Sequence, residues 1–556
     1  MSVESADLTL ECLYRHEGTR PDDVYMVQPL GNGEVRSYTW KEVVDESRRM
    51  AAYLKTQGFP PGSTISILSK NCAEFSMSNL AIWMAGHNAS PIYPTLDPDT
   101  VNYILTHSES RLLFVGKLDT WDQIKPGVSD DLPRVSYPLS PPTDYPSWSD
   151  IIAATDPIEG RPTRQADDLS LIFYTSGSTG QPKGVEATFA QMAASYRGIN
   201  QTFSMGTADR YISYLPMAHV MEAEVLNLML CGGCQVFFAE ALDTFVQDLQ
   251  RARPTIFVSV PRLWLKFQQG VFKKMPPQKL ERLLKIPILR GIVRRKVLKV
   301  LGLNQVRVAI TGSAPTPPEL IAWYRNLGLE LLEAYGMTEN FAYSHCSLPG
   351  RTRLGYVGHP FPGVECKIGE SDEILVRSPA TMSGYHKMPE ATVEVITEDG
   401  WLHTGDQGVL DEDGRLKIIG RIKELFKTSK GKYIHPVPIE NLLNASNYVE
   451  LSLVSGVGQP QPLAVVVLAE EIRARKEEPT VREEVTAALK ELREEINAKV
   501  AVFERLQLIV VARDEWTVEN GWLTPTMKVK RAPIEKAYQP HYKEWYDSQE
   551  PVVWQG

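Results

Sequence analysis

The segment from Tyr174 to Gly184 concentrates hydroxyl groups, glycines and one lysine in a few residues. Hydroxyl and backbone N–H groups are hydrogen-bond donors, and glycines allow the chain to approach a ligand closely. Phosphate groups need such donors together with a positive charge, which Lys183 supplies. The segment therefore predicts a phosphate-binding loop. Its candidate residues are Thr175, Ser176, Gly177, Ser178, Thr179, Gly180 and Lys183.

This loop does not match the two most familiar nucleotide-binding patterns. The pattern GxxxxGK[ST] needs a helix that starts at the lysine, but Pro182 precedes Lys183 and Gly184 follows it. The pattern GxGxxG is also missing from the loop. A Ser/Gly linker is the alternative interpretation. The buried strand predicted before the loop and the helix predicted after it favour a phosphate loop of another kind.

The composition is typical of a globular chain with several folding units. The chain has 556 residues, of which 43% are hydrophobic and 23% charged, and a net charge of −9. The negative charge argues against nucleic-acid binding. Six scattered cysteines favour a reduced compartment, and we expect no signal peptide and no membrane-spanning helix. These features predict a cytoplasmic protein, as a monomer or a homodimer.

Helices and strands alternate in the first part of the chain. Thr39 is expected to cap a helix that ends at Gly58. A short strand is expected at 63–69, and buried strands are expected at 111–115 and 169–174. Residues 136–166 are rich in proline and aspartate and are predicted to form a loop. Alternation of this kind predicts a layered α/β fold.

A different pattern begins near residue 420. A basic hairpin-like stretch is followed by two apolar strands, a charged helix at 481–499 and a strand near 506–512. This order predicts a small α+β domain. We therefore expect an N-terminal domain of residues 1–422 and a C-terminal domain of residues 423–556.

The stretch YTSGSTGQPKGV resembles the signature loop of the adenylate-forming superfamily, which includes acyl-CoA synthetases, peptide-synthetase adenylation domains and luciferases. Five further motifs resemble those of that family and follow in its order. They are TGSAP at 311–315, EAYGMTEN at 333–340, WLHTGD at 401–406, GRIKE at 420–424 and LTPTMKVKR at 523–531. The resemblance covers residues from about 30 to 535. It implies a large N-terminal domain of several subdomains with layered sheets and helices, and a small mobile C-terminal domain.

The resemblance implies an ATP site built from these motifs. Tyr335 would stack on adenine, and Asp406 and Arg421 would bind the ribose. A carboxylate suits that position because it can accept hydrogen bonds from two adjacent hydroxyl groups. The remaining nucleotide-binding residues implied by the resemblance are Gly312, Ser313, Ala314, Pro315, Gly336 and Met337.

The resemblance also implies catalytic groups. Adenylation joins two anions, a carboxylate and the α-phosphate of ATP, so positive charge must offset the negative charge that develops. Lys528 would act on the carboxylate and the α-phosphate, with Lys183 on the other phosphates. Thr338 would contact phosphate, and Glu339 would hold Mg²⁺. Lys423 would be the hinge about which the C-terminal domain swings to admit coenzyme A.

The segments 214–224 and 260–267 resemble the acyl-site segments of medium- and long-chain acyl-CoA synthetases. The resemblance therefore implies a fatty acid:CoA ligase that uses ATP, Mg²⁺ and coenzyme A. His219 would lie near the carboxyl group of the acid, with a purely structural histidine as the alternative. Gly431 would line the path of the coenzyme A thiol. Leu265 stands where many long-chain members have glutamate, so the chain length of the acid stays open.

Two other functions stay open. An adenylate-forming enzyme could pass its acyl group to a carrier-protein thiol or to an amine instead of coenzyme A. A protein on this fold could also bind a nucleotide or an acyl group without catalysis. The presence of Lys183, Glu339 and Lys528 argues against a binding protein.

Residues 262–300 are unusually basic for this acidic chain. They contain twelve lysines or arginines and one acid, Glu281, interleaved with leucine, isoleucine, valine and phenylalanine. Such a segment can lie on an anionic membrane surface, which would place the protein peripherally at the inner face of a membrane. A surface helix pair with its apolar face on the core is the other interpretation, and the sequence does not decide between them.

Overall fold

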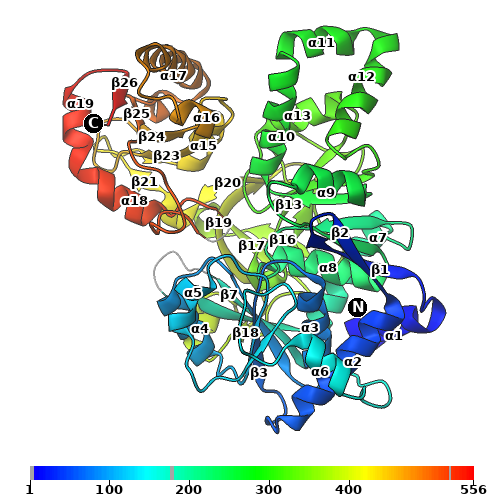
Figure 1. Cartoon of the computed structure of the whole chain (residues 1–556). Helices are drawn as coiled ribbons and strands as arrows, with labels where there is room; N and C mark the ends of the chain where they lie inside the picture. The colour runs from blue at the N-terminus through cyan, green and yellow to red at the C-terminus, as the bar shows by residue number, and fades with distance from the viewer. Residues whose placement is uncertain (1–4, 176–180, 525–526, 556) are drawn as a thin grey trace.

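The chain folds into a large N-terminal body, a helical arm and a C-terminal domain (Figure 1). The computed structural model describes residues 5–175, 181–524 and 527–555. Within these ranges, none of the helices combines the length and the apolar character that a bilayer crossing requires. The arrangement confirms the expected fold class, a layered α/β body with a smaller α+β unit.

One sheet of the body has the strand order β15-β14-β13-β12-β11-β9-β10-β1-β2. Its strands are β1 (Val24–Gly31), β2 (Glu34–Thr39), β9 (Arg210–Ser213), β10 (Gln235–Phe238), β11 (Ile256–Ser259), β12 (Val308–Thr311), β13 (Leu331–Tyr335), β14 (His345–Cys346) and β15 (His359–Pro360). Strands β9 to β13 run parallel. Their carboxyl ends therefore lie at one edge, which is where open α/β sheets bind ligands.

A second sheet has the order β18-β8-β7-β4-β3-β5-β6. It consists of β3 (Thr64–Leu68), β4 (Asn88–Ile92), β5 (Leu113–Val115), β6 (Arg134–Ser136), β7 (Leu169–Thr175), β8 (Lys183–Thr188) and β18 (Gly384–Tyr385). Every residue of β3 and of β4 is buried. These strands are therefore covered on both faces. They also bury polar side chains, namely Thr64, Ser66, Asn88 and Ser90.

Helices cover and separate the two sheets. They are α1 (Thr9–Thr19), α2 (Trp40–Thr56), α3 (Ala73–Met84), α4 (Pro98–His107), α5 (Trp121–Ile124), α6 (Trp148–Ala154), α7 (Phe189–Phe203), α8 (Val220–Gly232), α9 (Phe245–Ala252), α13 (Pro318–Asn326) and α14 (Pro389–Val393). Helices α3 and α8 are apolar on nearly all sides and lie in the main core. Thr39 caps α2 through a capping box, as its position predicts.

Two local predictions are wrong. The helix expected directly after the phosphate loop is preceded by β8, which pairs antiparallel with β7, and α7 begins only at Phe189. The segment 136–166, expected to be a loop, contains α6. Ser147 caps this short helix and Trp148 is buried, so packing stabilises a helix that its proline-rich surroundings disfavour.

A third, antiparallel sheet leads to the C-terminal domain. Its strands are β16 (Glu365–Ile368), β17 (Glu373–Arg377), β19 (Leu402–Leu410) and β20 (Leu416–Arg421). The chain leaves β20 through a single 3₁₀ turn, Ile422–Glu424. We propose that the domain boundary at 422/423 lies in this turn.

The C-terminal domain is built on the sheet β23-β24-β25-β26. Its elements are β21 (Phe426–Lys427), β22 (Tyr433–Ile434), α15 (Pro436–Asn444), β23 (Val449–Ser455), β24 (Leu463–Leu468), α16 (Glu470–Arg473), α17 (Pro479–Lys499), β25 (Ile509–Val511), α18 (Arg531–Tyr538), α19 (Tyr542–Asp547) and β26 (Val552–Trp554). Alternate residues of β24 belong to two separate apolar clusters, one on each face of this sheet.

The basic segment forms the helical arm. It folds as three helices, α10 (Pro261–Lys274), α11 (Pro277–Lys285) and α12 (Pro287–Val300), each with a proline in its first turn. The interpretation as a surface helix pair gave one helix too few. The arm projects from the body beside the C-terminal domain (Figure 1).

Candidate functional site

Two of the predicted motifs lie at the carboxyl edge of the parallel strands. The turn with Gly312, Ser313, Ala314 and Pro315 follows β12, and the turn with Gly336, Met337 and Thr338 follows β13. The two strands are adjacent and in register, so both turns emerge at the same edge. The Ser313 hydroxyl lies 3.3 Å from Met221 Sδ, which brings the first turn against the start of α8.

The turn after β13 depends on glycine at 336. A Cβ atom at that position would lie 2.4 Å from the carbonyl oxygen of Ala342, far inside van der Waals contact. The Met337 N–H donates to the side-chain oxygen of Asn340 at 3.0 Å, which closes the turn. Thr338 and Glu339 are thereby held at the edge of the sheet, where both remain partly exposed.

Tyr335, Asp406 and Arg421 form a hydrogen-bonded group. The Tyr335 hydroxyl donates to Asp406 Oδ2 at 2.7 Å, and Arg421 Nε donates to Oδ1 at 2.7 Å. Asp406 on β19 lies directly opposite Arg421 on β20, so strand pairing sets this geometry. The carboxylate raises the pKa of the Arg421 guanidinium and holds it charged.

Lys183, Tyr385 and Glu339 form a second group. The Tyr385 hydroxyl donates to Glu339 Oε1 at 2.8 Å. Lys183 Nζ lies 4.6 Å from the centre of the Tyr385 ring, within range of a cation–π contact. Tyr385 reaches this position because β18 pairs with β8, the strand that begins at Lys183. One tyrosine therefore contacts both a cation and a carboxylate implied in phosphate and metal binding.

Lys528 reaches the site from the C-terminal domain. A β-bridge between Leu523 and Val529 closes the loop that carries it, and its N–H donates to the Thr524 hydroxyl at 3.0 Å. The side chain keeps contact with solvent, but the surrounding protein and the charge of Arg421 lower its pKa to about 8. The charge of Asp406 acts in the opposite direction, so Lys528 lies within electrostatic range of the Asp406–Arg421 pair.

His219 lies in the same neighbourhood. It caps α8, and its Nδ1 accepts the N–H of Met221 at 3.1 Å. Burial, together with the charge of Lys528, lowers its pKa to about 3. The imidazole is therefore neutral, with its proton on Nε2, and can act as a hydrogen-bond donor to an anion.

The phosphate loop is described only at its ends. Thr175 and Lys183 face each other as the last pair of the β7–β8 ladder. The predicted residues Ser176, Gly177, Ser178, Thr179 and Gly180 lie outside the described residues.

The predicted hinge residue Lys423 lies two residues after Arg421 of this cluster, whereas the predicted thiol-path residue Gly431 lies in a separate hairpin. Lys423 is in the 3₁₀ turn that joins the third sheet to the C-terminal domain. Gly431 is in the β21–β22 hairpin, where its N–H donates to the Thr428 carbonyl at 3.0 Å and its φ is +77°. Within the described part of the chain, its recorded contacts stay in that hairpin, so this arrangement does not bring Gly431 to the cluster.

The sequence analysis assigned no role to Tyr385 or to Glu333, although Glu333 is the first residue of the motif EAYGMTEN. Glu333 is buried below the two turns, where it accepts the N–H of Thr316 at 3.1 Å, and burial raises its pKa to about 7. No local pattern singles out either residue. An acid in the middle of a buried strand is the one signal that could have drawn attention to Glu333.

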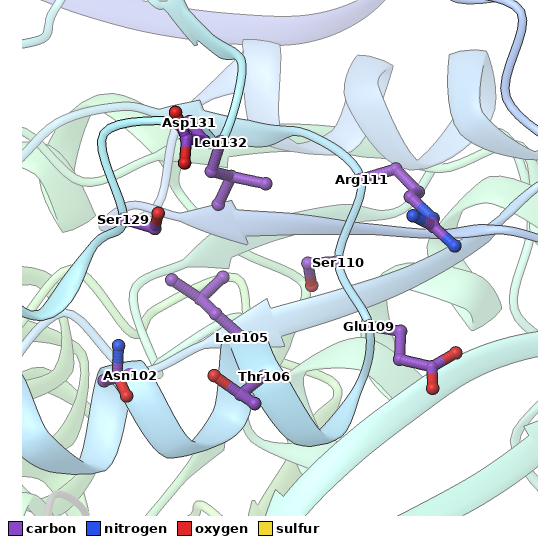
Figure 2. Close-up of a pocket in the computed structure, with 9 residues that line it drawn as sticks. All are labelled: Asn102, Leu105, Thr106, Glu109, Ser110, Arg111, Ser129, Asp131 and Leu132. Carbon is purple, nitrogen blue, oxygen red and sulfur yellow. The ribbon is translucent and has the colours of Figure 1, made fainter.

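Figure 2 shows a surface hollow of about 500 Å³ in the second-sheet region. It is lined by α4 residues such as Asn102 and by the loops that precede β5 and β6, which contribute Arg111 and Asp131. None of the candidate site residues named above lines it. Because the hollow lies apart from these residues, we place the functional site at the carboxyl edge of the parallel strands instead.

Comparison with protein families gives two matches that together span most of the chain. The family of AMP-binding enzymes matches residues 13–386, and the C-terminal domain of AMP-binding enzymes matches residues 424–550. Peroxisomal long chain acyl-CoA synthetase 6 of Arabidopsis thaliana is 30% identical, over 94% of this chain and 83% of its own length. Long-chain-fatty-acid–CoA ligase 1 of Cavia porcellus is also 30% identical, over 92% of this chain and 83% of its own length.

Solved structures share the fold. The anthranilate CoA ligase AuaEII, in complex with anthranoyl-AMP, has a TM-score of 0.78 and 21% identity, covering 97% of this chain and 100% of its own. The adenylation domain of a carboxylate reductase from Mycobacterium chelonae has a TM-score of 0.79 and 21% identity, covering 97% and 91%. At this identity the likeness establishes the architecture alone.

Proposed function

We propose that this chain, which belongs to the family of AMP-binding enzymes, joins a medium- or long-chain fatty acid to coenzyme A at the expense of ATP. The acid would first react with ATP to give acyl-AMP and pyrophosphate, and the acyl group would then pass to the thiol. The observation that carries this proposal is the hydrogen-bonded group of Tyr335, Asp406 and Arg421 at the edge of the parallel strands, with Lys528 within electrostatic range of it. The names of the relatives support a fatty acid as the substrate.

The clustered side chains suit the first half-reaction. Asp406 offers oxygens to the ribose hydroxyls, while Arg421 and Tyr335 fix the orientation of its carboxylate. Lys528 would place a positive charge between the attacking carboxylate and the α-phosphate. His219, as a neutral Nε2–H donor, would orient the carboxylate without neutralising it. Such preorganised donors are the main source of catalysis for this type of reaction.

Glu339 has the donor chemistry for Mg²⁺. In proteins, Mg²⁺ is usually held by one or two carboxylates together with substrate phosphates and water. Among the described residues there is no group of three or more histidines, cysteines or acids that could hold a metal ion by itself. Bound there, the ion would neutralise the β- and γ-phosphates. Tyr385 fixes the direction of the Glu339 carboxylate through Oε1.

The second half-reaction would need the C-terminal domain to turn, because Lys528 occupies the site while Gly431 lies away from it. The observed arrangement is held partly by ion pairs between α10 and the C-terminal domain, Arg262 with Glu450 and Lys273 with Glu471. The exposed pair of Lys273 with Glu471 contributes only about 0.2–1 kcal/mol. Glu450 is more buried and also pairs with Arg473 of its own domain, so it would keep a partner after rotation about Lys423.

Two measurements on a panel of acids from acetate to stearate test this proposal. Acid-dependent release of pyrophosphate from ATP would identify an adenylating enzyme, and thioester formation that requires coenzyme A would identify the acceptor. Pyrophosphate release without a coenzyme A thioester would favour a carrier-protein thiol or an amine as acceptor. Binding of nucleotide without pyrophosphate release for any acid would contradict catalysis. Contact of residues 262–300 with a membrane is not needed for this chemistry and is a separate proposal.

Tyr385→Phe is expected to raise the Mg²⁺ concentration that adenylation requires more than it raises the required concentration of the acid. The substitution removes the hydrogen bond to Glu339 but keeps the ring beneath Lys183. A hydrogen bond to a charged group contributes about 1.5–3 kcal/mol, so the Mg²⁺ concentration for half-maximal adenylation should rise roughly tenfold or more. Titration of pyrophosphate release with Mg²⁺, at saturating acid, measures this shift. An unchanged Mg²⁺ requirement would show that Tyr385 does not position Glu339.

Adenylation is expected to decline as pH rises through about 8. Lys528 is protonated below its pKa of about 8 and loses its charge above it, whereas His219, with a pKa of about 3, stays neutral throughout. The value of kcat/KM reports the free enzyme, so it should fall about tenfold per pH unit on the alkaline side. Lys528→Arg should abolish that decline whatever its absolute rate, because arginine stays charged. A decline that persists in this variant would assign it to another group.

A further inference from the structure

The outer face of α12 carries a group of exposed isoleucines. Ile288 is 82% exposed, and Ile292, one helical turn later, is 61% exposed. Ile286, at the corner between α11 and α12, is also exposed. Single exposed apolar side chains are common on soluble proteins, but grouped ones mark an interaction surface. Leu242, which is 91% exposed elsewhere, is an example of the single kind.

Basic side chains continue the same face of the helix. Arg295, Lys296 and Lys299 follow Ile292 at spacings of three, four and seven residues and are all exposed. The opposite face of α12 packs on the arm, where Val297 is buried in an apolar cluster that also contains Phe267 and Leu280. Because that inner face already anchors the helix, packing does not explain the isoleucines on the outer face.

Three of the other basic residues of the arm have partners within the protein. Arg262 and Lys273 pair with acids of the C-terminal domain. Arg294 Nε donates to the carbonyl oxygen of Asn326 at 2.7 Å. The interpretation of 262–300 as one basic surface is therefore too broad.

The available surface, which we call the α12 face, comprises Lys285, Ile286, Ile288, Ile292, Arg295, Lys296 and Lys299.

We propose that the α12 face docks on an anionic lipid membrane. Segment 262–300 has twelve basic residues and one acid in a chain of net charge −9, so an anionic surface would attract the arm and repel most of the remaining protein. The isoleucines would enter the boundary between headgroups and acyl chains, at a depth of roughly 5–10 Å. Helix α11 and the start of α12 form the end of the arm remote from the body, which leaves Ile286 and Ile288 accessible to a flat surface (Figure 1). The last turn of α12 returns to α9, where Gln250 Nε2 donates to the Val300 carbonyl oxygen at 3.1 Å.

Other binding partners would match only the basic residues or only the isoleucines of the α12 face. A nucleic acid would attract the basic residues but offers the isoleucines no apolar environment. A second copy of the chain, with its own α12 face apposed, would bury the isoleucines but bring like charges together. A membrane with anionic lipids supplies an apolar layer and negative charge side by side.

Co-sedimentation of the full-length chain with vesicles tests the proposal without any turnover, so its outcome is independent of the proposed ligase activity. We expect binding to vesicles of phosphatidylcholine with phosphatidylglycerol at low salt, release at high salt, and little binding to phosphatidylcholine alone. Arg295→Gln/Lys296→Gln/Lys299→Gln should lower the partition coefficient about a hundredfold. Ile288→Ser/Ile292→Ser should lower it by at least roughly tenfold.

Matched controls distinguish this face from general charge and apolar exposure. Leu242→Ser/Val393→Ser removes two side chains that are 91% and 78% exposed, and Lys490→Gln/Lys499→Gln/Lys543→Gln removes three exposed lysines. Both should bind vesicles as the unmodified chain does. Equal loss in these controls, pelleting without vesicles, or no preference for anionic vesicles would each overturn the proposal.

A site-specific probe locates the contact. The native cysteines are buried except the half-buried Cys366, so a Cys366→Ser background leaves few reactive thiols. An environment-sensitive dye on Ile288→Cys should shift to shorter wavelength when anionic vesicles are added. The same dye on Leu242→Cys should not. A shift of equal size at both positions, or at neither, would exclude the α12 face as the contact.

Discussion

Lys528→Ala is expected to lower the rate of adenylate formation by about 10²–10³-fold and to leave acyl transfer from preformed acyl-AMP nearly unchanged. Removing one preorganised charge that stabilises a developing anion has a cost of this size, about 3–4 kcal/mol. In the structure the charges of Arg421 and Asp406 both act on Lys528, so this lysine lies within electrostatic range of that pair. Transfer to the thiol involves no attack on phosphorus, so the lysine has no charge to offset there.

Separate assays of the two half-reactions measure this difference. Pyrophosphate release in a single turnover reports the first, and consumption of synthetic acyl-AMP with coenzyme A reports the second. Lys536→Ala, which removes an exposed lysine from α18 of the same domain, is the matched control and should affect neither. Equal losses of both half-reactions in Lys528→Ala would contradict the assigned role.

The parts of the fold that were predictable from sequence are those with local patterns. The capping signal at Thr39, the buried run at β3 and the charged helix α17 each depend on neighbouring residues, and each prediction is confirmed. Helix α6 was missed because its stability comes from the burial of Trp148 rather than from helix-forming neighbours. Strand β8 was missed because its own sequence does not show the alternation of apolar and polar residues that indicates a strand. Pairing with β7 makes this segment a strand.

The residues of the site were easier to predict from sequence than the contacts between them. Ordered motifs pointed to Tyr335, Asp406 and Glu339 one by one. The Tyr335 hydroxyl meets Asp406 across 71 residues of sequence, and Tyr385 meets Glu339 across 46. Such meetings depend on which strands are neighbours in a sheet, and β18 is only two residues long. No window of sequence contains that information.

Asp406→Ala is expected to weaken both half-reactions together, by about a hundredfold in apparent affinity for the nucleotide. ATP and acyl-AMP share the ribose, so a residue that binds the ribose hydroxyls serves both steps. Loss of one or two hydrogen bonds to a charged acceptor costs roughly 1.5–3 kcal/mol each. The substitution also removes the acceptor of Tyr335 and the counter-charge of Arg421.

The apparent affinities of ATP in the first half-reaction and of acyl-AMP in the second measure this effect. Asp406→Asn is the informative companion, because its amide oxygen can still accept a hydrogen bond while the negative charge is lost, and its effect should be intermediate. Thermal unfolding distinguishes a lost contact from a lost fold. Because Lys528→Ala should impair one step and Asp406→Ala both, an Asp406 variant that fails only in the first half-reaction would show that this carboxylate acts on the triphosphate or the attacking acid rather than on the ribose.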